Sequence, residues 1–262
     1  MKIGWCAPLK QAGLVREAGF DFLEVPLAPL GLEDKTTFDQ ARRELAECPI
    51  SVAAFNMFLP RDMRVVGPDT DDDRLTAYLG KAADLIDSAG ATIVVFGSGW
   101  ARNVPDDWER ARGEDQFLQA LSWCADALRG TGTTLVIEPL NRKESNIVNS
   151  VEEGVHFASQ VNRPEIRVLA DFYHMDEEQE PLETLAAHGA WLAHIHLADT
   201  GRRNPGTGSY DYGRFFDQLK SAQYTGMMSA ECNVERPTAD MRHSLAFLRS
   251  FERESSNSTV RA

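Results

Sequence analysis

The amino-acid sequence predicts a single (β/α)8 TIM barrel. Short runs rich in β-branched and aromatic residues alternate with helical patterns from end to end, which is typical of parallel strands joined by helical crossovers. A length of 262 residues fits one domain of this kind. No linker rich in Pro, Gly or Ser and no shift in composition marks a domain boundary. A doubly wound open sheet is the alternative architecture.

Eight segments are predicted as strands: Lys2 to Trp5, Phe22 to Val25, Ile50 to Phe55, Thr92 to Phe96, Thr134 to Ile137, Arg167 to Ala170, Leu192 to His196 and Met227 to Glu231. Helix signals lie between them. Asp71 begins an acidic run before apolar residues at helical spacing, and Gly90 suits the C-cap of that helix. Ser150 opens another helix, with Glu153 in a capping-box position.

The barrel domain is predicted to span residues 1–254. Residues 255–262 have almost no apolar content, so they are expected to form a flexible tail.

Composition excludes several functions. With 40 acidic and 27 basic residues the formal net charge is −13, which repels nucleic acids and anionic membranes. No apolar stretch approaches the roughly 20 residues that a bilayer span requires, and the N-terminus does not resemble a secretory signal. The four cysteines are scattered without the paired spacing of zinc sites, which suggests reduced thiols. We therefore expect a soluble, cytoplasmic protein with no nucleic-acid or membrane partner.

Four side chains with metal-binding chemistry each close a short apolar run: Glu138, Asp171, His196 and Glu231. They lie 33, 25 and 35 residues apart, about one strand-plus-helix unit each, so a barrel would bring them to one mouth. Any one of them alone is more often a helix cap or a surface residue. Together, three carboxylates and one imidazole suit Mn²⁺, Mg²⁺ or Co²⁺ better than a closed structural zinc site. Without a cation the three carboxylates would repel one another, and at least one would tend to take up a proton.

The segments around these residues resemble a known family. They are EPLNRKE at 138–144, DFYH at 171–174, HIH at 194–196 with an arginine at 202, and SAE at 229–231. Together they are similar to the xylose-isomerase-like barrel superfamily, and within it to the ketose 3-epimerase and hydroxypyruvate isomerase branch. The DNA-repair endonucleases of this superfamily use a larger zinc cluster with more histidines, and this chain has only six.

The resemblance implies a set of site residues: Glu138, Asp171, His196 and Glu231 as metal ligands, and Glu144, His174 and Arg202 as substrate contacts. The metal, most favourably Mn²⁺, would hold neighbouring oxygens of a sugar and stabilise an enediolate. Glu138 and Glu231 would stand on opposite faces and transfer the proton α to the carbonyl. Return of the proton to the opposite face gives epimerisation, whereas return to the neighbouring carbon gives aldose–ketose isomerisation.

The reaction and the substrate stay open. A lyase or dehydratase acting on a 3-keto-glycoside or a keto-inositol would use the same proton abstraction. A non-catalytic sugar-binding barrel or partner subunit is a third possibility. No basic cluster is evident beyond Arg202 and Arg203, which favours an unphosphorylated sugar or keto-sugar. Barrels of this superfamily often form homo-oligomers, so a dimer or tetramer is expected.

Other strand-end residues are ambiguous in the sequence. Glu24 and Asn56 are equally compatible with contacts to a sugar hydroxyl and with buried structural roles. His194 shares a strand face with His196, which favours a structural position below the metal. Residues 97–100, GSGW, invite comparison with a phosphate loop but lack its glycine pattern and the following Lys-Ser/Thr, so a tight turn is the better interpretation.

Overall fold

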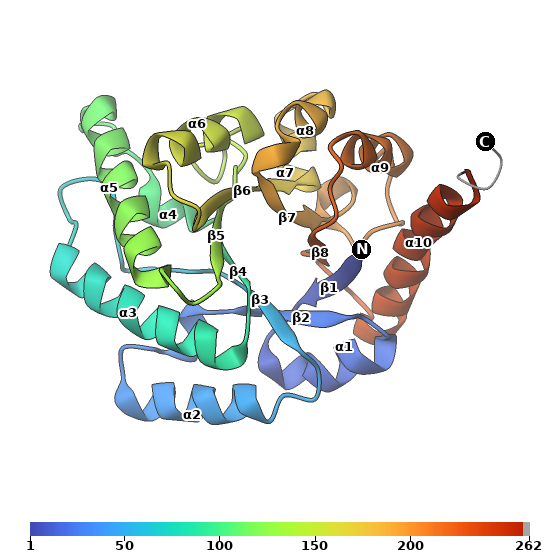
Figure 1. The fold of residues 1–262 in the computed structure, drawn as a ribbon, viewed down its shortest axis with the longest axis horizontal. Helices are drawn as coiled ribbons and strands as arrows, with labels where there is room; N and C mark the ends of the chain where they lie inside the picture. The colour runs from blue at the N-terminus through green and yellow to red at the C-terminus, as the bar shows by residue number, and fades with distance from the viewer. Residues whose placement is uncertain (259–262) are drawn as a thin grey trace.

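The computed structural model describes the backbone of residues 1–258 and the side chains of residues 1–251. Eight parallel strands close in chain order into a barrel, and β1 pairs with both β2 and β8 (Figure 1). The predicted TIM barrel is confirmed, and the open-sheet alternative is wrong. The strands are β1 (Lys2–Cys6), β2 (Phe22–Pro26), β3 (Val52–Asn56), β4 (Ile93–Phe96), β5 (Thr134–Ile137), β6 (Ile166–Asp171), β7 (Leu192–Leu197) and β8 (Met227–Ala230).

The predicted strand limits agree with these bounds to within two residues. The largest difference is at β3, which begins at Val52 rather than Ile50. The backbone of Ser51 nevertheless takes part in the pairing, because its carbonyl oxygen accepts the N–H of Leu23 at 2.9 Å. Glu231 follows β8 instead of ending it, yet its N–H still donates to the carbonyl oxygen of Leu197 at 3.0 Å. The strand-end side chains are therefore positioned by backbone pairing.

Helices surround the barrel (Figure 1). They are α1 (Ala12–Ala18), α2 (Lys35–Ala46), α3 (Asp72–Ala89), α4 (Gly99–Arg102), α5 (Arg110–Leu128), α6 (Val151–Val161), α7 (Phe172–Glu177), α8 (Glu183–Ala187), α9 (Tyr212–Ser221) and α10 (Pro237–Ser258). Short 3₁₀ segments occupy Leu9–Gln11, Ala28–Leu30, Gly189–Trp191 and Thr200–Arg202.

The predicted helix caps are present, with one shift. Asp71 accepts the N–H of Arg74, and Gly90 ends α3 in the left-handed conformation with φ of 69°. Ser150 accepts the N–H of Glu153 at 3.1 Å. The returning bond of the capping box comes from the N–H of residue 149 rather than residue 150, at 2.6 Å from Glu153 Oε2.

The end of α10 overlaps the predicted tail. The helix runs to Ser258, past the residue 254 at which the barrel domain was expected to end. Residues 259–262 lie outside the described part of the chain, so the flexible tail stays a prediction.

The inside of the barrel holds an apolar layer below a polar one. Alternate residues of a strand point to opposite faces, and Glu24 on β2 reaches His194 on β7 across the barrel at 2.8 Å. Phe22 shares that inward face and fills the interior so closely that a Cβ on Gly4 would lie 2.3 Å from its ring. The residues of this inner apolar cluster are Phe22, Ala54, Ile93, Val95, Val136 and Leu169. The polar residues of the barrel mouth therefore rest on a packed floor.

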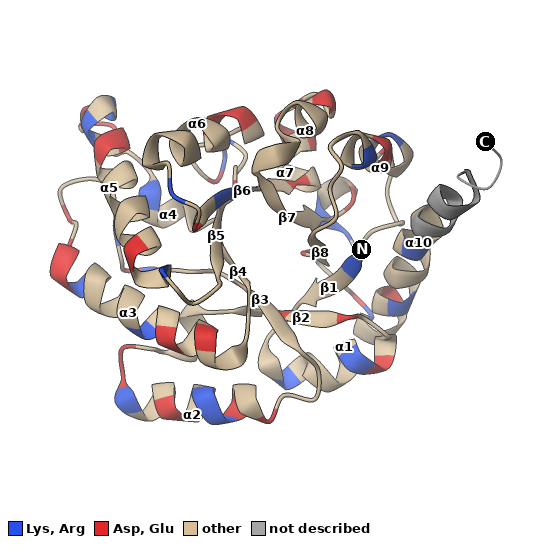
Figure 2. Ribbon diagram, viewed as in Figure 1, with Lys and Arg blue, Asp and Glu red and all other residues tan. Residues whose placement is uncertain are grey.

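Charged residues lie mainly in the surrounding helices, and basic and acidic residues alternate along α2 (Figure 2). None of the helices in the described part of the chain is long and apolar enough to cross a membrane. All four cysteines are free thiols, as the sequence suggested.

Candidate metal and substrate site

The four predicted metal ligands come together at the carboxyl ends of neighbouring strands. Glu138 follows β5, Asp171 ends β6, His196 lies in β7 and Glu231 follows β8. One ligand atom from each lies within 4.8 Å of the others. Nδ1 of His196 is 3.2 Å from the carboxylate of Glu138, 3.7 Å from that of Glu231 and 3.9 Å from that of Asp171. Three hard oxygen donors around one imidazole nitrogen fit a divalent cation.

Local hydrogen bonds direct two of the ligands. One oxygen of Asp171 caps α7 by accepting the N–H groups of Tyr173 at 2.8 Å and His174 at 3.4 Å. Its other oxygen is left to face His196. The backbone of Glu138 is held by the buried guanidinium of Arg102, which donates to its carbonyl oxygen at 2.6 Å. These contacts hold one carboxylate oxygen of Asp171 and the backbone of Glu138 in place.

The charges of the cluster act strongly on one another. Burial raises the pKa of Glu231, and the negative charges of Glu138 and Asp171 raise it further. The charge of His196 acts in the opposite direction and lowers it. Burial also opposes ionisation of Glu138, but the bond and charge of His196 bring the pKa of Glu138 below its usual value. The pKa of Glu231 is thus shifted in the direction expected for crowded carboxylates without a cation.

His174 presents an unpartnered nitrogen to the site. Its Nδ1 accepts the N–H of Asn141 at 3.1 Å, so the ring proton is placed on Nε2. Nε2 is buried and has no hydrogen-bond partner, and it lies 3.9 Å from Asp171. A ligand oxygen at this position would receive a hydrogen bond.

Arg202 connects the metal cluster to the predicted substrate residue Glu144. Its guanidinium donates to Glu231 at 2.6 Å and to Glu144 at 3.3 Å, and it lies over the ring of Tyr173. Burial alone would lower the pKa of Arg202, but the charges of Glu231 and Asp171 raise it, so the group stays protonated. The three predicted substrate residues thus surround the same cluster.

A cavity of about 410 Å³ opens above these residues. Its lining includes Asn56, Trp100, Glu138, Glu144, Arg202 and Glu231. The amide of Asn56 donates to Glu231 at 3.2 Å, a contact that the sequence left ambiguous. In the sequence, the signal for Asn56 was its position at the end of β3. Trp100 lines the cavity because of how the segment after β4 folds. The volume lies within the range of about 300–1,000 Å³ that small-molecule sites occupy.

The GSGW segment forms a tight turn into the four-residue helix α4. Its glycines are required by close approach to the site. A Cβ on Gly97 would lie 2.1 Å from Oε2 of Glu138, and one on Gly99 would lie 2.5 Å from the carbonyl oxygen of Glu144. The tight-turn interpretation therefore explains both glycines.

Glu24 and His194 form a buried layer beneath the metal cluster. The carboxylate of Glu24 bonds Nε2 of His194 at 2.8 Å and Nε2 of His196 at 2.7 Å. All three residues have no exposed surface. Glu24 is therefore a buried structural residue, and a contact with a sugar hydroxyl is wrong for it.

The comparison with known families agrees with this geometry. Residues 12–251 match the family model described as the xylose isomerase-like TIM barrel. The chain belongs to this family. The resemblance of the short segments around the ligands is thereby confirmed over most of the barrel.

Relatives within the family are named as sugar epimerases. The L-ribulose 3-epimerase of Methylomonas sp. is 29% identical over 227 residues, which cover 84% of this chain and 76% of the relative. The 3-dehydro-D-guloside 4-epimerase of Escherichia coli is 34% identical over 122 residues, 45% of this chain and 47% of the relative. The latter match thus spans about half of that relative. A solved structure of an L-ribulose 3-epimerase has the same fold, with a TM-score of 0.84, 20% identity and coverage of 100% of this chain and 99% of that one.

Proposed function

We propose that this protein is a divalent-metal-dependent sugar epimerase or isomerase. It would remove a proton α to the carbonyl of an unphosphorylated sugar and return it to the same or the neighbouring carbon. The observation that supports this best is the convergence of four ligand atoms within 4.8 Å beside a cavity lined by Glu144 and Arg202. When bound, Mn²⁺, or Mg²⁺ or Co²⁺ in its place, would polarise the carbonyl and stabilise the charge that develops on its oxygen.

The side chains divide the remaining work. Glu138 and Glu231 offer carboxylate oxygens from two different strand ends, so one can accept the proton and the other can return it. Positioned acid–base groups of this kind contribute about 10²- to 10⁴-fold each. Arg202 donates to the sugar oxygen that gains negative charge. His174, through Nε2, and Glu144 orient the sugar hydroxyl groups.

Proton exchange with solvent tests this function. Candidate ketoses incubated with the Mn²⁺-loaded protein in deuterated water should gain deuterium α to the carbonyl. Mass spectrometry detects the label, and chromatography separates the epimer from the aldose. Lack of exchange across a broad panel of ketoses and keto-sugars would rule out the proposal.

A second candidate is a lyase or dehydratase that acts on a 3-keto-glycoside or a keto-inositol. The likeness to a 3-dehydro-D-guloside 4-epimerase favours an oxidised glycoside as substrate. Product analysis separates the two reactions. Only a lyase releases the aglycone or water and leaves an unsaturated sugar, whereas an epimerase keeps the glycosidic bond intact.

Metal removal separates either enzyme from a non-catalytic barrel. A cation that binds only the folded state at 100 times its Kd stabilises that state by about 2.7 kcal/mol. Chelation of the Mn²⁺-loaded protein should therefore lower its free energy of unfolding. Stability that is unchanged by chelation, with less than one metal ion per chain after reconstitution, would support the non-catalytic reading.

The cytoplasmic location and the assembly into a dimer or tetramer stay predictions. Light scattering of the purified protein would measure the assembly, and fractionation of cells would measure the location.

A further inference from the structure

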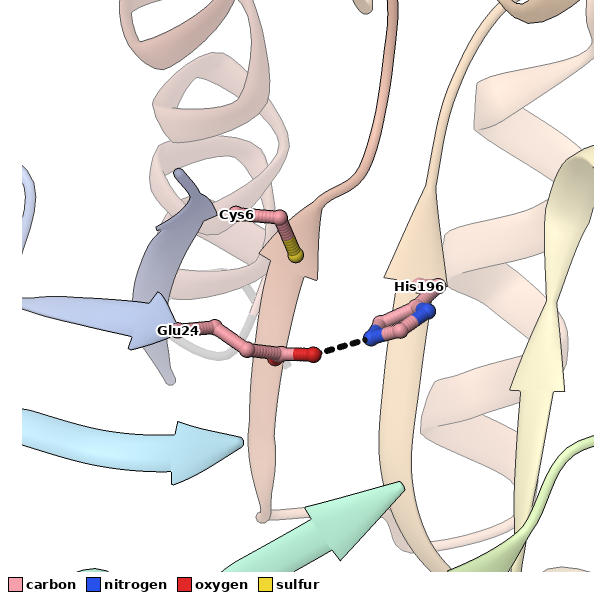
Figure 3. A group of neighbouring side chains, drawn as sticks. All are labelled: Cys6, Glu24 and His196. Carbon is pink, nitrogen blue, oxygen red and sulfur yellow. Dashed lines mark hydrogen bonds and ion pairs between the residues drawn. The ribbon is translucent and has the colours of Figure 1, made fainter. Parts of the chain in front are cut away.

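Glu24 lies at the centre of a buried group directly beneath the proposed metal site. Its Oε1 bonds Nε2 of His196 at 2.7 Å, and its Oε2 bonds Nε2 of His194 at 2.8 Å. Figure 3 shows the carboxylate directed from β2 to the His196 ring on β7, with the thiol of Cys6 beside them. Glu24 and both histidines are fully buried, so they have no contact with bulk solvent.

The two nitrogens of His196 therefore face different partners. Nε2 faces the carboxylate of Glu24, and Nδ1 faces the cluster of Glu138, Asp171 and Glu231. A neutral imidazole carries one proton, so one nitrogen donates and the other accepts. A carboxylate is only an acceptor, so the bond to Glu24 requires a proton on Nε2. Nδ1 lies 3.2 Å from the carboxylate of Glu138 and can carry a second proton while the cluster holds no cation. With a cation in the cluster Nδ1 must offer its lone pair, and the single remaining proton then stays on Nε2, where Glu24 accepts it.

We propose that Glu24 is a positioning residue for the metal centre, which holds the proton of His196 on Nε2 and so presents Nδ1 to the cation. The negative charge of Glu24 also makes the imidazole a stronger electron-pair donor to the metal. A carboxylate that is hydrogen-bonded to the far nitrogen of a metal-bound histidine raises the metal affinity by about 10- to 100-fold. The inference rests on the proposed metal site but not on the sugar reaction.

The second bond of Glu24 explains why a carboxylate is needed rather than an amide. His194 also donates its Nε2 proton to Glu24, and its Nδ1 has no hydrogen-bond partner. A carboxylate accepts both imidazole protons, whereas the glutamine side chain offers one oxygen acceptor and one NH₂ donor. With glutamine at residue 24, one of the two rings must accept from the NH₂ group. If that ring is His196, its proton moves to Nδ1 and blocks the metal-binding lone pair.

Cys6 gives this group a competing interpretation. Its sulfur, Glu24 and His196 also have ligand atoms within 4.8 Å of one another, which is compatible with a second cation. Such a cation would have to displace the Nε2 proton of His196 and the thiol proton together. Both oxygens of Glu24 are already bonded to imidazole nitrogens, so the positioning role fits the observed contacts better.

Metal binding and histidine NMR test the proposal without any assay of turnover. Protein labelled with ¹⁵N-histidine is freed of metal and titrated with ¹¹³Cd²⁺, and Mn²⁺ affinity is measured by competition with a chelator. In the wild type we expect the proton of His196 on Nε2 and scalar coupling of ¹¹³Cd to Nδ1. Glu24→Gln should bind Mn²⁺ about 10- to 100-fold more weakly and should show a fraction of His196 with its proton on Nδ1.

His194→Leu is the matched control. Its side chain has no donor, so it removes the other bond of Glu24 in the same buried layer and leaves the bond to His196 in place, and its Mn²⁺ affinity should stay near that of the wild type. Equal losses in the two variants would mean that the layer acts only by packing, which overturns the proposal. Unchanged affinity and an unchanged His196 tautomer in Glu24→Gln would overturn it as well.

The wild-type spectrum decides the matter even if Glu24→Gln fails to fold. Coupling of ¹¹³Cd to Nε2 of His196, or a second bound Cd²⁺ that is lost in Cys6→Ser, would show that Glu24 is itself a cation ligand. Either result would overturn its role as a positioning residue for His196. A wild-type protein that binds no divalent metal would instead refute the proposed function itself.

Discussion

The carboxylate of Glu138 occupies the space that a side chain at Gly97 would need. A Cβ on Gly97 would lie 2.1 Å from Oε2 of Glu138, closer than any real contact of this kind. The strand end of β4 thus leaves room for the ligand that follows β5. The tight turn after β4 thus leaves space for the carboxylate of Glu138.

Gly97→Ala should therefore displace Glu138 and weaken the metal site. We expect a loss of about 10- to 100-fold in Mn²⁺ affinity, of the size found when the surroundings of a ligand are disturbed, together with a loss of turnover. Chelator competition measures the affinity. Gly80→Ala is the control, because a Cβ there meets nothing within 4 Å and alanine favours the helix by about 1 kcal/mol. Wild-type affinity in Gly97→Ala would show that Glu138 can move without consequence.

Arg102 should stabilise the fold at the same strand ends. Its fully buried guanidinium donates to the carbonyl oxygens of Phe96 at 3.1 Å and Glu138 at 2.6 Å. Burial lowers the pKa of Arg102 to about 10, so it stays charged at neutral pH. Arg102→Met removes both bonds: the carbonyl oxygen of Phe96 keeps the N–H of Glu138 at 3.3 Å, but the buried carbonyl oxygen of Glu138 loses its donor, at a cost of about 1–3 kcal/mol. Urea denaturation should show this loss.

The matched control for Arg102 is an exposed arginine. Arg129 pairs with Asp126 at the surface, with 64% and 55% of the two side chains exposed. Pairs of this kind contribute about 0–1 kcal/mol, so Arg129→Met should change the free energy of unfolding little. Similar losses in the two variants would refute a special role for the buried guanidinium.

Glu138→Gln and Glu231→Gln should each abolish turnover while the barrel stays folded. Loss of one acid–base group lowers the rate by about 10²- to 10⁴-fold, and weaker metal binding adds to this in both variants. Turnover is measured at saturating Mn²⁺, and circular dichroism checks the fold. A near-normal rate in either variant would remove that residue from proton transfer.

Glu180 should make the stability of the protein depend on pH. Burial raises the pKa of Glu180 to about 7. The hydrogen bond that Glu180 accepts from the N–H of Val151 lowers this pKa but does not offset the burial. In the unfolded chain a glutamate titrates near pH 4.3, at about the reference value. Between these pH values the folded state binds the proton more tightly, so its stability falls as the pH rises from about 4.3 to 7.

Glu180→Gln does not titrate, so its stability relative to the wild type should increase from pH 5 to pH 8. Urea denaturation at both pH values measures the difference. Glu17→Gln, at an exposed position of α1, should show a much smaller change. A difference that is the same at both pH values would contradict the buried character of Glu180.

The barrel could be predicted from the sequence because the signals for its strands and helices are local. Strand runs and caps such as Asp71 and Gly90 depend on neighbouring residues, and the structure reproduces them within two residues. The spacing of Glu138, Asp171, His196 and Glu231 indicated one mouth, because each follows the repeat of a strand and a helix. Glu24 gave no such signal: its partners lie 170 and 172 residues away along the chain.

The sequence by itself determined the barrel, the four candidate ligands and the family, because periodicity, caps and strand-end motifs are properties of short segments. Only the tertiary structure decided how those ligands are held. It placed Glu24 against His196, Arg102 against the backbone of Glu138, and Gly97 where Glu138 needs room. The physical reason is that each of these contacts joins residues from different strand ends that lie far apart in the sequence. They exist only once the strands have been brought into register.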